Sequence, residues 1–458
     1  MPQPTNPNPL ETAYTQTLPN SRALFERASK LFPDGVTHDN RRMQPFPIFV
    51  DRADGAHKWD IDGRCYIDYW MGHGALLFGH NPPHVRDAVL EQVSRGTHYG
   101  ASHPLEVAWG EWICRLVPCA ERVRFTASGT EATHMAVRLA RAFTGKKRVI
   151  KFAGHFHGWH EGLEVGVQAP YETFPEAGQL PAVVDVVALC PPNDIAAVRA
   201  ALAAGDVAAV ILEPTGGHFG AVPVTPGFLA QLHDETRKTG TVLIFDEVVT
   251  GFRVAPGGAQ ELFGVTPDLA TFAKILAGGL PGGAVAGRAE IMAYLATKAT
   301  PEETHRTKMP HPGTFNANPL SAAAGVAMLA SVADGTAIRL ANAQAAKLRH
   351  GMNEILAREQ VAWKVYGQHS DWKVYYGADA PPRDGNDQAV DNIPWQRLDA
   401  RYPVQSRVLR QAMILQGIDF NGARALVGTC HTDDVIAHTL EGFAAAIRAV
   451  KAAESHRY

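Results

Sequence analysis

Long hydrophobic runs, paired cysteines and clusters of basic residues are all absent from the sequence. The longest apolar stretches, such as residues 207–212, are too short to cross a bilayer, so no membrane span is expected. The formal net charge of −3, with no basic block, gives no indication of a nucleic-acid partner. The N-terminal stretch MPQPTNPNPLETAYTQ lacks the basic and apolar regions typical of a secretory signal.

Cysteine is scarce and scattered. The five cysteines are odd in number and show no C-x-x-C spacing, which argues against a disulfide framework and against a cysteine-based zinc site. They favour reduced thiols in a cytoplasmic protein.

The chain is long enough, at 458 residues, for one large domain and one smaller domain. We expect an N-terminal region made of a polar arm, a helix over 20–32 and a small antiparallel β-ribbon over 44–70. The predicted boundaries are 1–75 for this region, 76–325 for a large domain and 326–458 for a C-terminal small domain. Residues 376–400 are polar and contain prolines, which predicts a long loop within the last region.

Short apolar runs alternate with longer helical stretches through the large domain. The runs VRFTAS, RVIKFAG, VAAVILEP, TVLIFDEV, DLATFAK and GGAVAGR predict an α/β fold with a mostly parallel sheet covered by helices. Ligands of such sheets bind outside the carboxyl ends of the strands. The chemically functional residues of this chain follow these runs.

The first such segment is Ser128-Gly129-Thr130-Glu131, which follows the run VRF. A strand, a turn of small residues and a helix start direct backbone N–H groups and the helix dipole to one place, where a phosphate is favoured. A helix cap formed by Ser128 or Thr130 with Glu131 is the alternative interpretation.

The second and third segments place ionisable groups where apolar runs end. Asp246 closes TVLIFD, and a carboxylate there favours a cationic partner such as a protonated pyridine ring. A capping acid is the alternative, and a magnesium-dependent nucleotidase would need GxxxxGK[ST], which the sequence lacks.

Lys274 is the last residue of the run LATFAK. Desolvation at this position would favour the neutral amine that imine formation needs. A surface lysine with an extended side chain is the alternative.

Several segments together resemble one enzyme family. SGTEA, the EP of LEPTGGHFG, FDEVVTGFR, FAKILAGGLPGG and GTFNANPL resemble motifs of the class III (subgroup II) aminotransferases, which are fold-type I pyridoxal-phosphate enzymes. The resemblance runs from about Phe25 to the C-terminus, with few matches over 365–400. The chain is most similar to the glutamate-1-semialdehyde aminomutase branch. GVTHDNRR, GHGALLFGHNPP, YGASHPLE and EPTGGHFG more specifically resemble stereo-inverting D-phenylglycine aminotransferases.

The resemblance implies a fold with a smaller domain built from both chain ends, and roles for residues around pyridoxal 5′-phosphate. Lys274 would form the Schiff base and carry the proton between substrate and cofactor, and Asp246 would keep the ring nitrogen protonated. The other implied cofactor contacts are Ser128, Gly129 and Thr130 at the phosphate, Phe156 and Val248 on the two ring faces, His157 in the pocket, Glu213 near the ring hydroxyl, and Thr314. Phe156 stands where many relatives carry Tyr, so a phenol is missing.

Further implied contacts concern the substrate and a second subunit. Thr314 would reach the phosphate of a neighbouring subunit, which implies a homodimer with shared sites. Arg41 matches a position that binds the substrate carboxylate, although Arg42 is adjacent and could take this role. Trp70, His73 and His218 would line the substrate side, unless Trp70 belongs to the core of the ribbon. Small-molecule amino acid and 2-oxo acid substrates are expected, with an aromatic or bulky amino acid favoured.

The segment His155-Phe-His157-Gly-Trp-His160 has the H-x-H-x-x-H spacing of some zinc hydrolases. Such enzymes usually carry an acid before the last histidine, where this chain has Trp159, and a zinc site needs further ligands from elsewhere. We therefore expect no metal.

The expected activity is that of a ping-pong aminotransferase, which moves an amino group from an amino acid, an aromatic or D-configured one among the candidates, to a 2-oxo acid through a Schiff base on Lys274. An aminomutase of the glutamate-1-semialdehyde type uses the same cofactor and retains its intermediate, and an amino-acid racemase is a further alternative. A binding protein without activity is possible on any fold, but Lys274 together with Asp246 argues against it.

Overall fold

The computed structural model describes residues 9–171, 176–378, 390 and 392–455. The chain forms two compact units by its internal contacts. Unit 1 comprises Met1–His73, Leu77–Pro82 and Arg339–Tyr458, and unit 2 comprises Gly74–Leu76 and Pro83–Ile338.

Unit 2 is built on a seven-stranded sheet with the order β4-β10-β9-β8-β7-β5-β6. The neighbouring strands from β9 to β6 are parallel, and β10 is antiparallel to both β9 and β4. The strands are β4 (Arg122–Thr126), β5 (Arg148–Phe152), β6 (Val187–Cys190), β7 (Val207–Leu212), β8 (Val242–Asp246), β9 (Leu269–Ala273) and β10 (Gly283–Gly287). The predicted, mostly parallel sheet is therefore confirmed.

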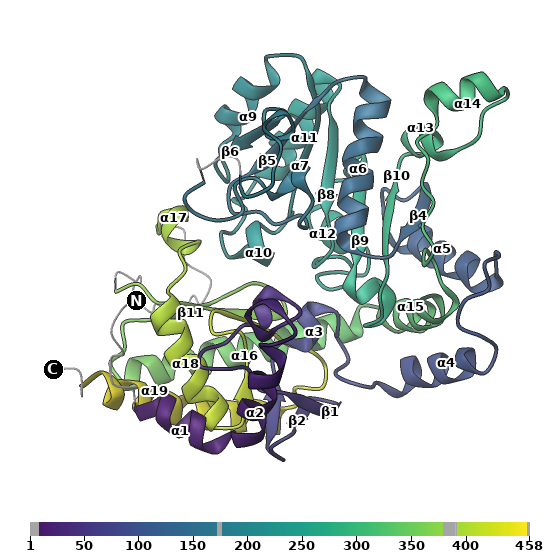
Figure 1. Ribbon diagram of the computed structural model, residues 1–458. Helices are drawn as coiled ribbons and strands as arrows, with labels where there is room; N and C mark the ends of the chain where they lie inside the picture. Colours follow the sequence, from purple (N-terminus) through teal and green to yellow (C-terminus); the bar gives the residue numbers. More distant parts are fainter. Residues whose placement is uncertain (1–8, 172–175, 379–389, 391, 456–458) are drawn as a thin grey trace. The chain divides into compact units, whose positions relative to one another are not determined.

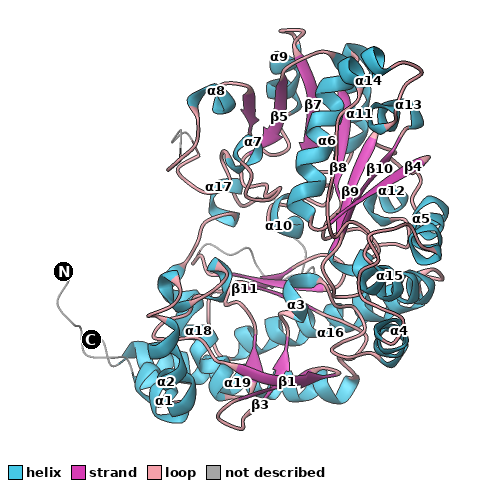
Figure 2. Cartoon of the chain, turned by 45° about the vertical axis from the view of Figure 1, so that its right-hand side comes forward, coloured by secondary structure: helices cyan, strands magenta, loops and turns pink. Residues whose placement is uncertain are grey.

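Helices cover both faces of this sheet because the side chains of each strand alternate between the faces. Ile211 and Ile244 pack with helix α6 (Gly129–Thr144) in one hydrophobic cluster. Val210 and Leu243 face the other way, onto α9 (Ile195–Leu202) and α11 (Phe228–Thr239). Figure 2 shows the helices on either side of the strands.

The helical elements of unit 2 other than α6 are mostly short (Figure 1). They are α4 (Pro83–Val93), α5 (Pro104–Leu116), α7 (Glu161–Glu164), α8 (Pro181–Val184), α9 (Ile195–Leu202), α10 (Gly217–Gly220), α11 (Phe228–Thr239), α12 (Gly258–Phe263), η3 (Lys274–Ala277), α13 (Ala289–Met292), η4 (Ala293–Leu295), α14 (Pro301–Thr307) and α15 (Pro319–Val332).

Unit 1 joins the two chain ends in one core. Strand β13 from the C-terminal part pairs in parallel with β3 of the N-terminal ribbon, which gives the sheet order β1-β2-β3-β13. A second sheet has the order β11-β12-β14. The strands are β1 (Val50–Asp54), β2 (His57–Asp60), β3 (Cys65–Asp68), β11 (Lys364–Tyr366), β12 (Asp371–Tyr375), β13 (Ile418–Asp419) and β14 (Arg424–Leu426). The expected small domain from both chain ends is present.

The helices of unit 1 pack around these sheets. They are α1 (Pro9–Thr17), α2 (Pro19–Ala28), η1 (Pro33–Gly35), η2 (Asp39–Arg41), α3 (Met71–Gly74), α16 (Thr336–Arg358), α17 (Trp395–Leu398), α18 (Pro403–Leu415) and α19 (Asp433–Ser455). Within the described residues, no single helix has the length and hydropathy to cross a membrane. The pair α15 and α16, bent by 73° at its break, passes that test together.

One local expectation differs from the structure, and one strand was not predicted. The segment predicted as a polar arm contains α1, because Leu10 and Tyr14 are buried and the Tyr14 hydroxyl donates to the Phe46 carbonyl over 2.8 Å. The edge strand β6 was not predicted, although residues 186–190 are all apolar; three of its four residues are only partly buried. Much of the predicted loop over 376–400 lies outside the described residues, although α17 forms near its end.

Candidate active site

The predicted site residues of unit 2 follow the carboxyl ends of its strands. Ser128 lies after β4, His157 after β5, Glu213 after β7, Asp246 at the end of β8, and Lys274 directly after β9. These strands run in the same direction, with β10 inserted antiparallel between β4 and β9. Their carboxyl ends therefore share one edge of the sheet, which is where parallel α/β sheets bind ligands.

The start of α6 is the turn that the sequence predicts to bind an anion. Ser128 is the N-cap, and its hydroxyl oxygen accepts from the Glu131 amide over 3.2 Å. The Glu131 carboxylate in turn accepts from the Ala127 amide, so the cap predicted as an alternative is present. The first amides of a helix have no acceptor within the helix and, together with the helix dipole, favour an anion.

Gly129 fixes how closely this turn approaches β8. A Cβ atom at Gly129 would lie 2.9 Å from a Val248 methyl group, so any larger residue would force the helix start away from Val248. The close approach brings the anion-binding turn next to a residue predicted to pack on the cofactor ring. A phosphate group at the helix start and a ring against Val248 therefore fit the residues that are present.

Asp246 is a buried carboxylate whose two oxygens have different partners. Oδ2 lies 2.6 Å from His157 Nδ1, while Oδ1 accepts from the Val248 amide over 3.1 Å and from the Thr271 hydroxyl over 3.2 Å. Both Asp246 and His157 are buried. These contacts fix the plane of the carboxylate and leave it without a lysine or arginine among its hydrogen-bond and ion-pair partners within the described residues.

Only one of the two ring nitrogens of His157 has a hydrogen-bond partner among the described residues. Its Nε2 is buried and has no hydrogen-bond partner among the described residues. A buried polar atom without a partner costs free energy unless a ligand or water satisfies it. The pair of His157 and Asp246 therefore fits a site that binds a polar or cationic ring.

The three histidines of the H-x-H-x-x-H segment are directed to separate partners. His155 Nδ1 accepts from the Glu213 amide over 3.0 Å, and His160 Nε2 lies 3.4 Å from the Thr133 hydroxyl. Burial is the main cause that lowers the pKa of His160 to about 3 and the pKa of His155 well below its ordinary value. Within the described ranges, no group of three or more potential ligands could hold a metal ion.

Lys274 is half-buried and lies at a break in backbone conformation. It follows β9 with φ of +53°, in the left-handed region that non-glycine residues rarely adopt. Gly278 and Gly279 also have positive φ and close the short helix η3. A strained lysine directly after a buried strand indicates a functional position.

Glu213 follows β7 and accepts three backbone hydrogen bonds. Oε1 accepts from the amides of Phe156 and His218, and Oε2 accepts from the amide of Phe219, at 2.9–3.0 Å. The resemblance predicts Glu213 near the ring hydroxyl of the cofactor, but it gives no indication of these loop contacts.

Thr314, also in unit 2, is exposed, and its backbone carbonyl oxygen lies 2.5 Å from His98 Nε2.

Arg41, Trp70 and His73 belong to unit 1. Arg41 is exposed and donates to the Thr37 hydroxyl over 2.9 Å, whereas Arg42 pairs with Asp34. The Trp70 and His73 rings meet edge to face at 4.8 Å, and Trp70 is only partly buried. Their role in substrate binding stays a prediction.

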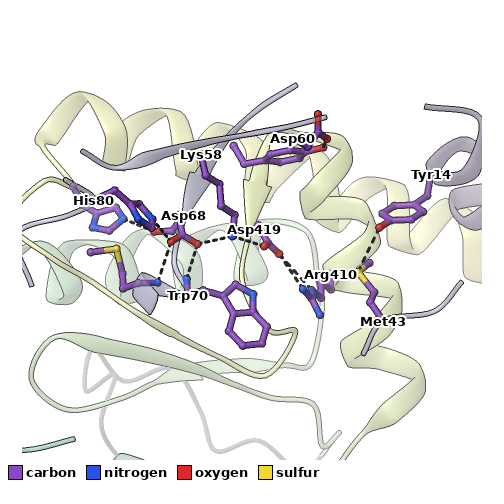
Figure 3. A network of polar contacts seen from close by, with 12 residues as sticks. Tyr14, Met43, Lys58, Asp60, Asp68, Trp70, His80, Arg410 and Asp419 are labelled. Carbon is purple, nitrogen blue, oxygen red and sulfur yellow. Dashed lines mark hydrogen bonds and ion pairs between the residues drawn. The ribbon is translucent and has the colours of Figure 1, made fainter. Parts of the chain in front are cut away.

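A network of charged residues holds the turn that carries Trp70. Asp68 accepts from the amides of Trp70 and Met71, and it also pairs with Lys58 and His80 at 2.7 Å each (Figure 3). The turn needs this support because Met71, Gly72 and His73 all have positive φ.

Sequence reasoning missed one neighbour of a predicted site residue in each unit. Thr271 pairs with Asp246 across β8 and β9 and donates to its carboxylate; a lone hydroxyl within the apolar run LATFA was the available signal. His38 stacks on His73 with ring centroids 4.7 Å apart, which no local pattern indicated.

The comparison with protein families identifies the chain. The profile described as Aminotransferase class-III matches residues 38–368. The chain belongs to the aminotransferase class-III family. A glutamate-1-semialdehyde 2,1-aminomutase of Methanothrix thermoacetophila is 41% identical over 369 residues, which cover 80% of this chain and 84% of the relative.

Solved structures of this family confirm the predicted fold. An omega-transaminase from Sphaerobacter thermophilus aligns with a TM-score of 0.83 and 31% identity, covering 94% of this chain and 98% of its own. A glutamate-1-semialdehyde-aminomutase from Pseudomonas aeruginosa aligns with a TM-score of 0.84 and 25% identity, covering 96% and 97%. A further neighbour, 29% identical with a TM-score of 0.84 over 95% and 98%, is described as a transaminase with PLP bound. The prediction of pyridoxal 5′-phosphate as the cofactor is confirmed at the level of the family.

Proposed function

We propose that this chain moves amino groups with bound pyridoxal 5′-phosphate and that Lys274 attaches the cofactor covalently. The observation that carries the proposal is the placement of Asp246 and Lys274 at the carboxyl ends of the neighbouring parallel strands β8 and β9. One strand end supplies a fixed negative charge and the next supplies an amine.

The cofactor, when bound, supplies an electron sink that stabilises the carbanion left after the substrate loses its Cα proton. Asp246 supplies the charge that keeps the ring nitrogen protonated. His157 and Thr271 hold the Asp246 carboxylate in one orientation, so little reorganisation is needed when charge develops.

Lys274 Nζ would take the proton from the substrate Cα and deliver it to carbon C4′ of the cofactor. Ser128, Gly129 and Thr130 bind the phosphate at the start of α6. Phe156 and Val248 enclose the ring, and Gly129 allows Val248 to approach. Arg41, Trp70, His73 and His218 contribute substrate contacts.

We further propose a cytoplasmic homodimer in which Thr314 of one subunit reaches the phosphate bound by the other. The exposed position of Thr314 in unit 2 is compatible with such a contact. The cytoplasmic location rests on the scattered, unpaired cysteines.

The first candidate outcome is isomerisation of glutamate-1-semialdehyde type, in which one substrate donates the amine and regains it. The curated relatives support this outcome over the aminotransferase expected first, since relatives between 33% and 41% identical are named glutamate-1-semialdehyde 2,1-aminomutases.

The second candidate outcome is transfer between two molecules, from an amino acid to a 2-oxo acid. The omega-transaminase structure supports it, because that enzyme is 31% identical to this chain while the aminomutase structure is 25% identical. Both outcomes use the same residues of unit 2 and differ in whether the oxo product leaves.

Absorbance of the holoenzyme during single additions of substrate separates the two outcomes. Glutamate-1-semialdehyde should isomerise without a second substrate if the chain is an aminomutase. A panel of L-, D- and β-amino acids should instead bleach the yellow band and release an oxo acid if the chain is an aminotransferase. If borohydride fails to fix the cofactor to Lys274, the proposed function is wrong.

A further inference from the structure

Two loops of unit 2 meet at the Glu213 carboxylate. One is the loop after β5, which carries Phe156, and the other is the turn of α10 after β7, which carries His218 and Phe219. Oε1 accepts from the Phe156 amide over 3.0 Å and from the His218 amide over 2.9 Å. Oε2 accepts from the Phe219 amide over 3.0 Å.

The contact is reciprocal. The Glu213 amide donates to His155 Nδ1 over 3.0 Å, so residues 155 and 156 and residue 213 exchange a hydrogen bond in each direction. Burial, with the nearby His157, lowers the pKa of His155 well below its ordinary value, and the neutral ring can therefore accept at Nδ1. Both loops are thus tied to one another at the carboxyl ends of β5 and β7.

The α10 turn needs this support. His218 and Phe219 have φ of +53° and +61°, and two successive non-glycine residues in this region are strained. Space around the turn is also limited, because a Cβ at Gly216 would lie 2.0 Å from the Val222 carbonyl oxygen. In this strained conformation the amides of His218 and Phe219 point at Glu213.

A carboxylate is the side chain that fits these three donors. Glu213 is buried, and an ionised carboxylate offers acceptors on both oxygens. A glutamine can offer an acceptor at only one of the two positions, so at least one amide would face an NH₂ group. An aspartate keeps the charge but is one methylene shorter.

We propose that Glu213 is a positioning residue, which holds the Phe156 loop and the His218–Phe219 turn in one arrangement. The residues that contact the cofactor ring and the substrate are then in place before either ligand binds. The proposal rests on the proposed function for the roles of Phe156 and His218. We call the three hydrogen bonds from the amides of Phe156, His218 and Phe219 to the Glu213 carboxylate the Glu213 clamp. The existence of this clamp does not depend on the proposed function.

Hydrogen exchange measured by mass spectrometry tests the clamp directly. Glu213→Ala should speed amide exchange in peptides covering 154–158 and 216–221 together, in the presence and absence of cofactor. Glu213→Gln should speed exchange mainly in 216–221, since its oxygen can remain at the Oε1 position. Glu302→Gln, an exposed change on α14, is the matched control.

Kinetics of the holoenzyme test the positioning role. Glu213→Gln should raise the KM of the amino substrate roughly 10-fold, the effect of losing one charged-acceptor hydrogen bond, and lower kcat less. The visible circular dichroism of the bound cofactor should also change. Glu213→Asp should show similar changes for a different reason, because its carboxylate keeps both acceptor oxygens but is one methylene too short to reach all three amides.

Two results would overturn the proposal. Wild-type exchange in both peptides of Glu213→Ala would show that the loops hold without the clamp. Wild-type KM and circular dichroism in both Glu213→Gln and Glu213→Asp would show that the clamp does not position the reactants. A failure of the proposed function is distinguishable, since it would appear in the wild-type protein as the absence of a borohydride-fixed adduct on Lys274.

Discussion

Buried charged groups are paired differently in the two units. In unit 1, Lys58 lies 2.7 Å from both Asp68 and Asp419, Asp68 also pairs with His80, and Asp419 also contacts Arg410 (Figure 3). These residues come from both chain ends, so the ion pairs hold β2, β3, β13 and α18 together.

Unit 2 satisfies its buried charges with dipoles and histidine. Asp246 is held by His157, Thr271 and a backbone amide, and the fully buried Lys151 donates to the Leu163 carbonyl over 2.6 Å. Burial lowers the pKa of Lys151 to about 7, although Glu164 and Glu213 oppose this.

This difference indicates that the buried charges of unit 1 stabilise the fold, whereas Asp246 in unit 2 is able to bind a ligand. In unit 1 each of the buried carboxylates Asp68 and Asp419 already has a cationic partner, and removing that partner would leave an uncompensated buried charge. A carboxylate held mainly by dipoles, such as Asp246, retains its capacity to stabilise a cation on a ligand. We therefore expect substitutions in unit 2 to change activity and those in the unit 1 network to change stability.

Replacement of Lys274 should have the largest effect. Lys274→Ala should reduce turnover by at least about 10⁴-fold, because the covalent attachment and the proton carrier are both lost. Far-ultraviolet circular dichroism should show an unchanged fold, and steady-state assays give the rate. Turnover close to that of the wild type would contradict the assignment of Lys274.

Neutralising Asp246 should have the next largest effect on activity. Asp246→Asn should retain cofactor but slow loss of the Cα proton by about 10²- to 10³-fold, since the fixed charge is removed. Rapid-mixing absorbance measures this step. Thr271→Val removes only one of the carboxylate's hydrogen bonds and should have a clearly smaller effect; equal effects would argue against a role for the charge.

Breaking the unit 1 network should change stability. Lys58→Met leaves Asp68 and Asp419 buried without their shared cation and should cost about 3–5 kcal/mol of the free energy of unfolding. Denaturant unfolding measures the loss, and Lys30→Met, at an exposed lysine, is the control. Equal stability of the two variants would show that the network contributes little.

The smallest expected effect is a dependence of stability on pH. Burial alone would raise the pKa of the Asp68 carboxyl, but Lys58 and His80 reverse this and hold it well below its ordinary value. The folded pKa is thus below the unfolded value of about 3.9, so the stabilisation is present above about pH 4 and is lost as the pH falls further. Unfolding midpoints at decreasing pH should show this loss, and Lys58→Met should reduce it.

Much of the fold and of the candidate site could be predicted because its signals are local. The runs that became β7, β8 and β9 are continuous and apolar, and Asp246 and Lys274 follow them directly in the sequence. The contacts of Glu213 with the amides of His218 and Phe219 could not be predicted, since backbone amides carry no sequence signal. Helix α1 was missed because the burial of Tyr14 depends on Phe46, far along the chain.

The sequence by itself determined the apolar runs that became β7, β8 and β9, the turn of small residues before α6, the strand-end acid and lysine, and the family. Each depends on neighbouring residues, on periodicity or on a motif. Only the tertiary structure decided that His157 pairs with Asp246, that Glu213 joins two loops, and that Lys58 joins both chain ends. These contacts link residues tens to hundreds of positions apart, and such pairings are set by how the sheets assemble.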